Sequence, residues 1–244
     1  RLVLVWESDS RDHDLNIVSA PNFWDWQRQN RVFEHMALFD SAGKGYSLGA
    51  SSSGREAEQV SGVRVTADFF RVLGVEPFLG RGFLAEEEAP GRDRVVVLSH
   101  GLWTRRYGGD RAIVGRPIRI DGENHVVVGV MPPGFQFQFW SDLRELWVPA
   151  GWTPGDYGRN SHSFVAIARL RTGVSIAQAN AEMAGIQRLL EDHYSGAIDR
   201  SKLLCILATF AEGLPRFVYG RPVACPEEAE PVPADITALS PAVV

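Results

Sequence analysis

Cysteines and membrane-spanning runs are scarce in this sequence. Its 244 residues contain two cysteines, Cys205 and Cys225, which permit one disulfide but do not decide the redox compartment. No segment approaches the ~18–20 consecutive apolar residues that a membrane helix needs; the densest late run is Leu203–Phe210. We also expect no signal peptide in this segment, because it opens on the strand-like Leu2–Trp6. We therefore expect a piece of a longer protein that itself carries no transmembrane segment.

Motifs that bind nucleotides, metals or nucleic acids are missing as well. Gly43-Lys44-Gly45 is too short to be the glycine-rich loop that cradles phosphates. The six histidines are scattered without the spacing of zinc ligands. The formal net charge is −5 with acidic and basic residues interleaved, which argues against nucleic-acid binding. The sequence therefore predicts no cofactor, no metal and no nucleic-acid partner.

Two short motifs resemble parts of a serine hydrolase. The segment Gly45–Gly49 matches G-x-S-x-G around Ser47, and Ser99-His100-Gly101 resembles the turn that helps build an oxyanion hole. A nucleophile elbow needs a strand, a sharp turn and then a helix, whereas the small residues Ala50–Gly54 follow here. The two motifs also occur in reverse order. We therefore predict no catalytic residues and no enzyme activity, and keep a serine hydrolase only as a third hypothesis.

Three adjacent carboxylates, Glu86, Glu87 and Glu88, raise the question of a metal site. Adjacent residues on a helix point in different directions, so these side chains cannot converge on one ion. We predict a solvated helix start instead.

The stretch from Asp93 to Phe135 gives the clearest local pattern. Its apolar run Arg94–Leu98 suits a strand buried on both faces. Ser99 is placed to cap a helix over Gly101–Tyr107. Two strand-like runs then flank Asp121-Gly122, a dipeptide typical of tight hairpin turns. These runs are Pro117–Asp121 and His125–Val130.

Helix starts are marked elsewhere by capping residues. Ser19 with Pro21 opens one helix, Thr66 caps a short one over Ala67–Leu73, and Ser175 caps the helix Ile176–Tyr194. The segment Val32–Leu38 fits either a helical turn or a strand. Further strands are expected over Leu2–Trp6, Phe39–Leu48, Glu56–Thr66, Glu145–Val148, Ser163–Leu170 and Lys202–Thr209, with a loop over Gln136–Arg144.

Aromatic side chains gather in two places. Phe23, Trp24 and Trp26 are expected to be buried against the body of the fold rather than to stack on a ligand. The group Phe137, Phe139 and Trp140 could form an exposed contact patch, or could pack locally under its loop. This group supplies the candidate contact residues of the sequence.

Five segments in order resemble the extracytoplasmic (periplasmic) core domain of MacB-like ABC transporter permeases, and most closely the large permeases of the acidobacterial type. The resemblance runs from about Leu2 to Tyr194. Its segments are Ser19–Glu34, Val63–Phe83, Arg94–Asp110, Ile113–Phe135 and Ala168–Met183.

The resemblance implies an α+β fold of two subdomains. A porter-like β-α-β part would be built from both chain ends, residues 1–78 and 151–209, with a small inserted α/β subdomain over residues 79–150. Glycine and proline content places boundaries near the same positions, at Val75–Gly82 and Gly151–Asn160. Residues 210–244, rich in proline and glutamate, are expected to be a disordered tail.

The resemblance also implies a place and partners. The domain would lie on the extracytoplasmic face of the bacterial inner membrane. Its partners would be the transmembrane helices of the parent permease and an ABC ATPase subunit, with a dimer and a periplasmic partner protein also compatible. The main hypothesis is therefore a transporter domain that couples ATP-driven conformational change to export or to substrate and partner handling. The alternative is a free-standing extracytoplasmic binding module derived from a permease.

Overall fold

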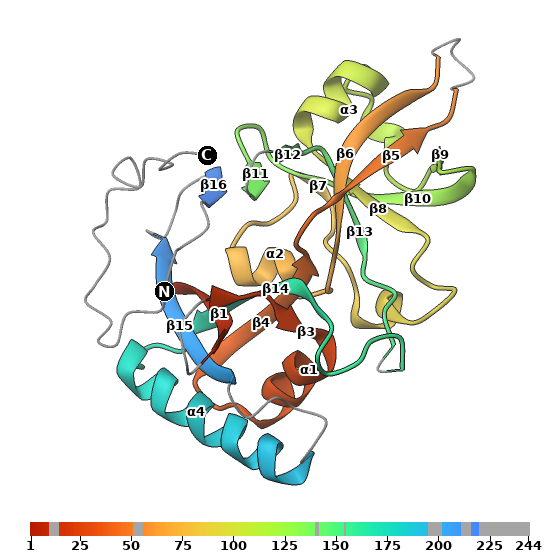
Figure 1. Ribbon diagram of the computed structural model, residues 1–244. Coiled ribbons are helices and arrows are strands. Elements are labelled where there is room, and N and C mark those ends of the chain that lie inside the picture. The colour runs from red at the N-terminus through yellow and green to blue at the C-terminus, as the bar shows by residue number, and fades with distance from the viewer. Residues whose placement is uncertain are drawn as a thin grey trace, which may run out of the picture. The chain divides into compact units, whose positions relative to one another are not determined.

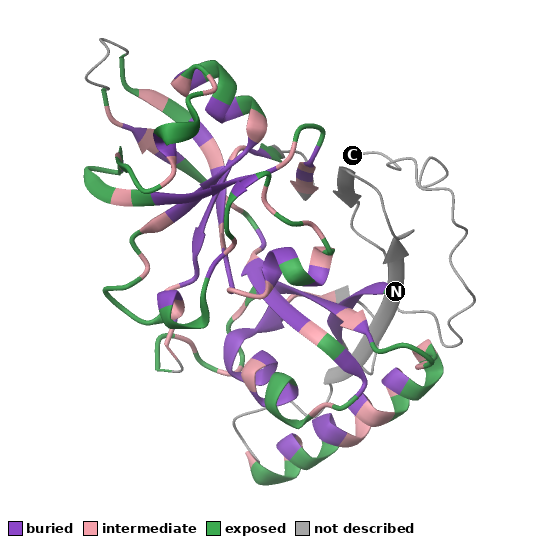
Figure 2. Cartoon of the chain, turned by 180° about the vertical axis from the view of Figure 1, so that it is seen from behind, coloured by how far each residue is buried: buried purple, intermediate pink, exposed green. Residues whose placement is uncertain are grey.

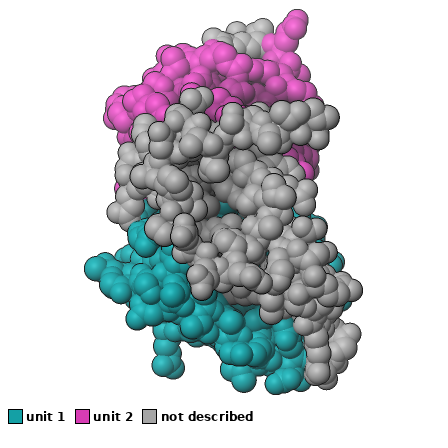
Figure 3. Space-filling view, turned by 60° about the vertical axis from the view of Figure 1, so that its left-hand side comes forward, with its two compact units in different colours: residues 1–41, 154–213, 219–244 teal, residues 42–153, 214–218 magenta. Residues whose placement is uncertain are grey.

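The structure is a mixed α/β fold with few helices and a core built on sheets (Figure 1). The computed structural model describes residues 1–9, 15–50, 56–139, 142–153, 155–194, 202–210 and 216–219. Within these ranges no helix has the length and apolar character that crossing a membrane requires. The chain separates into two compact units, coloured in Figure 3. Unit 1 comprises Arg1–Ser41, Pro154–Gly213 and Tyr219–Val244, and unit 2 comprises Ala42–Thr153 and Leu214–Val218.

Unit 1 contains an antiparallel sheet in the order β4-β14-β1-β15. Two short strands extend it, β2 beside β1 and β3 beside β14. Helices α1 and α4 contact each other, and they pack on this sheet through β4, β14 and β15. The elements are β1 (Leu2–Asp9), β2 (Leu15–Asn16), β3 (Val18–Ser19), α1 (Ala20–Gln29), β4 (Phe33–Asp40), β14 (His162–Leu170), α4 (Ile176–His193) and β15 (Lys202–Phe210).

The two helices of unit 1 begin where the sequence predicts. The Ser19 hydroxyl accepts a hydrogen bond from the backbone N–H of Asn22, and Ser175 forms a capping box with Gln178. In α4 the buried apolar side chains recur at three- and four-residue spacing, so one face of the helix is covered. They are Ala179, Met183, Ile186 and Leu190.

Unit 2 is organised around a closed barrel. Its strands pair in the order β13-β8-β10-β9-β5-β6, and β13 also pairs with β6, which closes the sheet on itself. The β8–β10 and β6–β13 pairs are parallel, and the other pairs are antiparallel. The barrel strands are β5 (Lys44–Leu48), β6 (Glu58–Val65), β8 (Val95–Leu98), β9 (Pro117–Ile120), β10 (Glu123–Val130) and β13 (Leu146–Pro149).

Smaller elements surround the barrel. Strand β7 pairs with β10, and β11 and β12 form a second sheet with β16. The Asp121-Gly122 turn between β9 and β10 has φ values of 50° and 87°, as the predicted tight hairpin requires. The remaining elements of the unit are α2 (Phe69–Leu73), β7 (Leu79–Gly80), η1 (Ala85–Glu88), α3 (His100–Tyr107), η2 (Arg111–Ile113), β11 (Gln136–Phe139), β12 (Asp142–Arg144) and β16 (Arg216–Tyr219).

Alternating side chains of the barrel strands fill its interior. The core cluster includes Tyr46 and Leu48 from β5, Leu146 and Val148 from β13, and Leu102 from α3. Figure 2 shows this concentration of buried residues along the strands. Helix α3 therefore closes over the barrel and contributes to its core.

The organisation differs in two places from the sequence-based expectations. The first subdomain boundary is predicted at residues 78/79, whereas the compact unit 2 begins at Ala42, because β5 and β6 pair with β9 and β13. The expected loop Gln136–Arg144 instead holds β11 and β12, which pair with each other. The expected tail, 210–244, lies outside the described residues except for Phe210 and β16.

Two local predictions concern the segment Val32–Leu38 and the short helix that follows Thr66. The segment Val32–Leu38, left open between helix and strand, enters strand β4. The helix expected over Ala67–Leu73 begins later than predicted. That helix begins only at Phe69, with Asp68 as its N-cap residue, and it ends at Gly74, which has the left-handed conformation.

Replacing Gly129 by alanine should destabilise the barrel. A Cβ atom at Gly129 would lie 2.3 Å from the backbone carbonyl oxygen of Arg81, and this backbone is held beside β10 by the β7 pairing. We expect Gly129→Ala to lower the free energy of unfolding by about 2 kcal/mol, measured by urea titration. The matched control is Gly101→Ala on the exposed face of α3, where the nearest atom is 3.9 Å away. It should stabilise by about 0.5–1 kcal/mol. Equal unfolding midpoints for the two variants would contradict the prediction.

Candidate functional site

The serine hydrolase motifs do not form a catalytic arrangement. Ser47 lies within β5, paired with Gln59 of β6, and its backbone N–H donates to the Asp121 carboxylate at 2.8 Å. Ser99 caps α3, its hydroxyl accepting from the Leu102 N–H at 3.1 Å. The His100 ring packs against Trp103, with centroids 5.2 Å apart. The G-x-S-x-G serine is therefore a strand residue, not one presented at the start of a helix.

Phe137 does not belong to an exposed contact patch. Phe137 is fully buried and packs edge-on against Phe69, with ring centroids 5.0 Å apart. The side chain of Phe139 and the whole of Trp140 lie outside the described residues. By contrast, Phe23 and Trp26 of α1 are buried as predicted, and the Trp26 indole N–H donates to the Gln187 side chain at 3.2 Å.

The acidic run is not a purely solvated helix start. Glu87 is buried and accepts two hydrogen bonds from the Arg81 guanidinium, at 2.6 and 2.9 Å, and one from the Leu84 N–H. Burial acts to raise the pKa of Glu87, but the hydrogen bonds from Arg81 and the backbone outweigh it and lower that pKa. Burial raises the pKa of Glu88, whose carboxylate accepts from the Ala67 N–H. Among the described residues no cluster of His, Cys, Asp or Glu could hold a metal ion.

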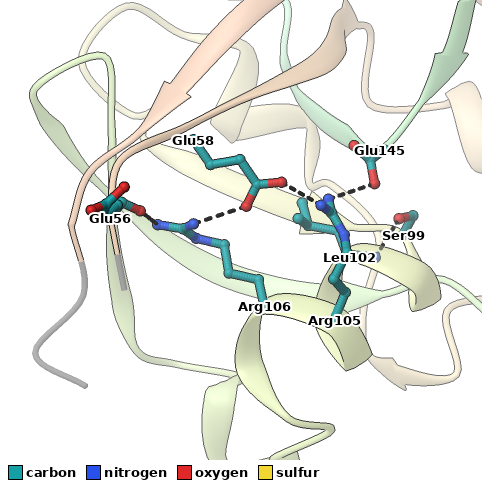
Figure 4. A network of polar contacts seen from close by, with 7 residues as sticks. All are labelled: Glu56, Glu58, Ser99, Leu102, Arg105, Arg106 and Glu145. Atoms are coloured by element: carbon teal, nitrogen blue, oxygen red, sulfur yellow. Dashed lines mark hydrogen bonds and ion pairs between the residues drawn. The ribbon is translucent and has the colours of Figure 1, made fainter. Parts of the chain in front are cut away.

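A network of ion pairs fixes α3 to the barrel (Figure 4). The carboxylate of Glu58, on β6, lies between Arg105 and Arg106 of α3 and pairs with both. Arg105 also pairs with Glu145, just before β13, at 2.9 Å. Each guanidinium therefore connects the helix to a strand that closes the barrel.

Arg106 is the most buried member of this network. Its side chain is only 3% exposed and lies 2.9 Å from Glu58 Oε2. Its second terminal nitrogen donates to the carbonyl oxygens of Gly49 and Glu56, at 2.8 and 3.2 Å. Burial acts to raise the pKa of Glu58, but the hydrogen bonds from Arg105 and Arg106 lower it overall. The two ends of the β5–β6 connection are thus held by one buried cation.

A second polar network lies inside unit 1, and few features of the sequence indicated it. Glu7, which follows the strand expected over Leu2–Trp6, is a buried residue of β1. One of its oxygens accepts from the Asn22 amide at 3.0 Å, and the other lies 2.6 Å from His162 Nε2. Arg159 donates to Asn22 at 3.0 Å and pairs with the buried Asp25 at 2.7 Å. The polar Asn22 and Asp25 beside buried aromatics in α1 were the only available signal.

Unit 2 also has an open pocket of about 510 Å³ on the β5–β6 hairpin. Two cationic side chains line it, Lys44 and Arg144, together with the polar Gln59 and Ser61. The sequence interpretation missed this site, because Arg144 joins the hairpin from a segment expected to be a loop. The remaining lining residues are Ala42, Gly43, Gly45, Val60 and Leu143.

Comparisons with known proteins point to one family. The model of the MacB-like periplasmic core domain matches residues 7–186. No curated protein matches the sequence. Among solved structures, a domain of a putative permease protein from Porphyromonas gingivalis is similar, with a TM-score of 0.59 and 17% identity over 87% of this chain and 91% of that one.

Two further solved structures share the fold. The periplasmic region of MacB from Actinobacillus actinomycetemcomitans has a TM-score of 0.54 and 11% identity, over 84% of this chain and 87% of that one. The extracellular domain of the noncanonic ABC-type transporter YknZ from Gram-positive bacteria has a TM-score of 0.56 and 13% identity, over 84% of this chain and 99% of that one.

Neutralising Glu58 should destabilise the protein in a pH-dependent way. The folded-state pKa of Glu58 lies below the unfolded-state value of about 4.3. Its stabilisation is therefore complete above about pH 5 and is lost as the pH falls through the folded-state pKa. We expect Glu58→Gln to cost about 2 kcal/mol at pH 7, with the difference from wild type shrinking below about pH 4. Urea unfolding of both proteins at a series of pH values measures this difference in the free energy of unfolding.

The control for this prediction is Glu123→Gln. Glu123 pairs with Arg94 at 3.0 Å, but both side chains are more than half exposed, and such surface pairs contribute little. A pH-independent cost for Glu58→Gln, or an equal cost for the control, would contradict the role of the network.

Proposed function

Since this chain belongs to the family of MacB-like periplasmic core domains, we propose that it couples ATP-driven conformational change in a permease to export or to substrate and partner handling. The family is that of ABC transporter permeases, which are transporters, and the chain is a periplasmic domain of this family. ATP hydrolysis would belong to a separate ATPase subunit.

The proposal rests on the contacts that hold unit 2 together internally. Strand β13 closes the barrel, and the Glu58, Arg105, Arg106 and Glu145 network fixes α3 to it. A body tied together in this way can be displaced without changing its internal distances. That property suits a part that transmits movement rather than one that performs chemistry.

The proposed arrangement has two parts and several partners. Unit 1, which is built from both chain ends, would be the porter-like part, and unit 2 would be the part inserted between them. The transmembrane helices of the parent permease would move the domain in response to the ATPase subunit. A second copy of the permease and a periplasmic protein are further partners in this proposal.

The test uses spin-label distances in the parent permease, reconstituted with its ATPase. Cys205 and Cys225 are first replaced by serine. One label pair, Thr104→Cys with Asn124→Cys, lies within unit 2; the other, Thr104→Cys with Arg188→Cys, joins unit 2 to unit 1. All three positions are exposed. Distances are compared between the nucleotide-free and vanadate-trapped states. We expect the first distance to stay constant and the second to change.

Two other outcomes would contradict parts of the proposal. If neither distance changes while the ATPase turns over, the coupling proposal is wrong. If the distance within unit 2 changes, that unit does not move as one body. Transport activity of the labelled permease, measured in the same vesicles, is the control for intact function.

A further inference from the structure

The turn between β9 and β10 contains a dipeptide with a known kind of reactivity. Asp121-Gly122 is the only Asp-Gly sequence in the chain. The backbone nitrogen that follows an aspartate can attack its side chain, and a glycine leaves that nitrogen unshielded because it has no Cβ atom. Both residues are exposed. A Cβ atom on Gly122 would have no heavy atom within 4 Å apart from those of its chain neighbours. The turn is therefore open to water and to this reaction.

The carboxylate of Asp121 is held on the neighbouring strand β5. Its Oδ1 accepts a hydrogen bond from the backbone N–H of Ser47 at 2.8 Å, and its Oδ2 accepts one from Lys44 Nζ at 2.7 Å. For the reaction, the carboxyl carbon has to come into contact with the nitrogen of Gly122. Since both oxygens are bound to β5, the side chain is restrained from turning onto that nitrogen while these contacts are made.

The same contacts keep the carboxyl group in its less reactive form. Burial acts to raise the pKa of Asp121, but the hydrogen bonds from Lys44 and the Ser47 N–H outweigh it and lower that pKa, with a further contribution from the charge of His125. A protonated carboxyl group can release water when a nitrogen attacks it, whereas an ionised one has no good leaving group. The contacts with β5 therefore oppose the reaction both by position and by charge.

These contacts lie at the joint between β5 and β9 in the barrel. Leu48 of β5 pairs with Ile120 of β9, and the Asp121 N–H donates to the Ser47 carbonyl oxygen at 2.8 Å. The side chain and the backbone of Asp121 thus both attach the turn to β5. When this joint opens, the carboxyl group is released and the turn can react.

We propose that Asp121 is the site at which this chain forms isoaspartate, and that its contacts with Lys44 and the Ser47 N–H limit the rate. The Gly122 nitrogen bonds to the carboxyl carbon of Asp121, and the carboxyl hydroxyl leaves as water with the amide proton, which gives a cyclic imide. Water then adds to the former main-chain carbonyl carbon and breaks its bond to that nitrogen. The main chain now runs through the former side chain, and the overall composition is unchanged.

The modification changes the joint that restrains it. It adds an atom to the main chain of a tight turn, next to the pairing of Ile120 with Glu123, and it moves the carboxylate away from β5. Isomerisation therefore loosens the attachment of the β9–β10 turn to the barrel. This proposal is independent of the coupling role, because it concerns one turn of unit 2.

The experiment ages the 244-residue chain at neutral pH, once folded and once in concentrated guanidinium chloride. Isoaspartate in the tryptic peptide Ile120–Arg144 is quantified by mass spectrometry with electron-transfer fragmentation. We expect isoaspartate at Asp121, with a folded-state rate about tenfold below the denatured-state rate, the effect of one hydrogen bond to a charged group. Asp142, in the same peptide but followed by leucine, is the internal control and should stay unmodified.

Variants test the role of Lys44. Lys44→Met removes the ammonium and should raise the folded-state rate about threefold, a modest effect because both members of the pair are partly exposed. Lys44→Arg keeps a cation and should stay near the wild-type rate. Arg94→Met is the matched control, since it removes an exposed cation that pairs with Glu123 of the same hairpin. All variants should react at one rate in guanidinium chloride, and urea unfolding checks that each one folds.

Three results would overturn the proposal. Equal rates in the folded and denatured chains would show that the contacts of Asp121 do not control the reaction. A wild-type rate in folded Lys44→Met, or an equal acceleration in Arg94→Met, would exclude the ammonium of Lys44 from that control. Faster formation of isoaspartate at any other aspartate would show that the turn is not the reactive site.

Discussion

Strand β13 is the constraint on which unit 2 depends. It has only four residues, yet it pairs with β6 in parallel and with β8 in antiparallel orientation. These two pairings close the sheet of unit 2 on itself. Leu146, its first residue, reaches the space left by Gly62, where a Cβ atom would lie 2.5 Å from the leucine side chain. The closure, the core and the position of α3 all follow from this short strand.

Buried charges have a common role in the two units. Glu7 and Asp25 in unit 1, and Glu87 and Arg106 in unit 2, are nearly inaccessible, and each has an ionic or hydrogen-bonding partner. Removing a charge from water costs several kcal/mol, so such pairs add little net stability. They fix positions instead, because breaking one leaves an uncompensated charge. In unit 2 this means a helix held at one place on its barrel.

The sequence predicted best what is determined locally. The caps at Ser19, Ser99 and Ser175 and the hairpin at Asp121-Gly122 depend on neighbours within a few residues, and they were identified correctly. The five ordered segments also indicated the family that the comparison shows.

The sequence was least informative where the structure depends on partners outside the local pattern. The unit boundary depends on β6 pairing with β13, some 80 residues away. Arg144 reaches Ser61 and Ala42 from a segment that carries no regular pattern, and this pairing creates the pocket. Glu87 looked like a solvated carboxylate because its partner, Arg81, lies outside the acidic run.

The interrupted course of unit 1 has a consequence during synthesis. The first part of strand β1, Leu2–Trp6, is apolar, and both main partners of the strand, β14 and β15, lie more than 150 residues later. Until they emerge, β1 presents open edges that can pair with other chains. All the barrel strands of unit 2 are synthesised in this interval, and early folding of the barrel would shorten the flexible connection between β1 and its partners. The inserted barrel would then act as a folding aid for the unit that surrounds it in sequence.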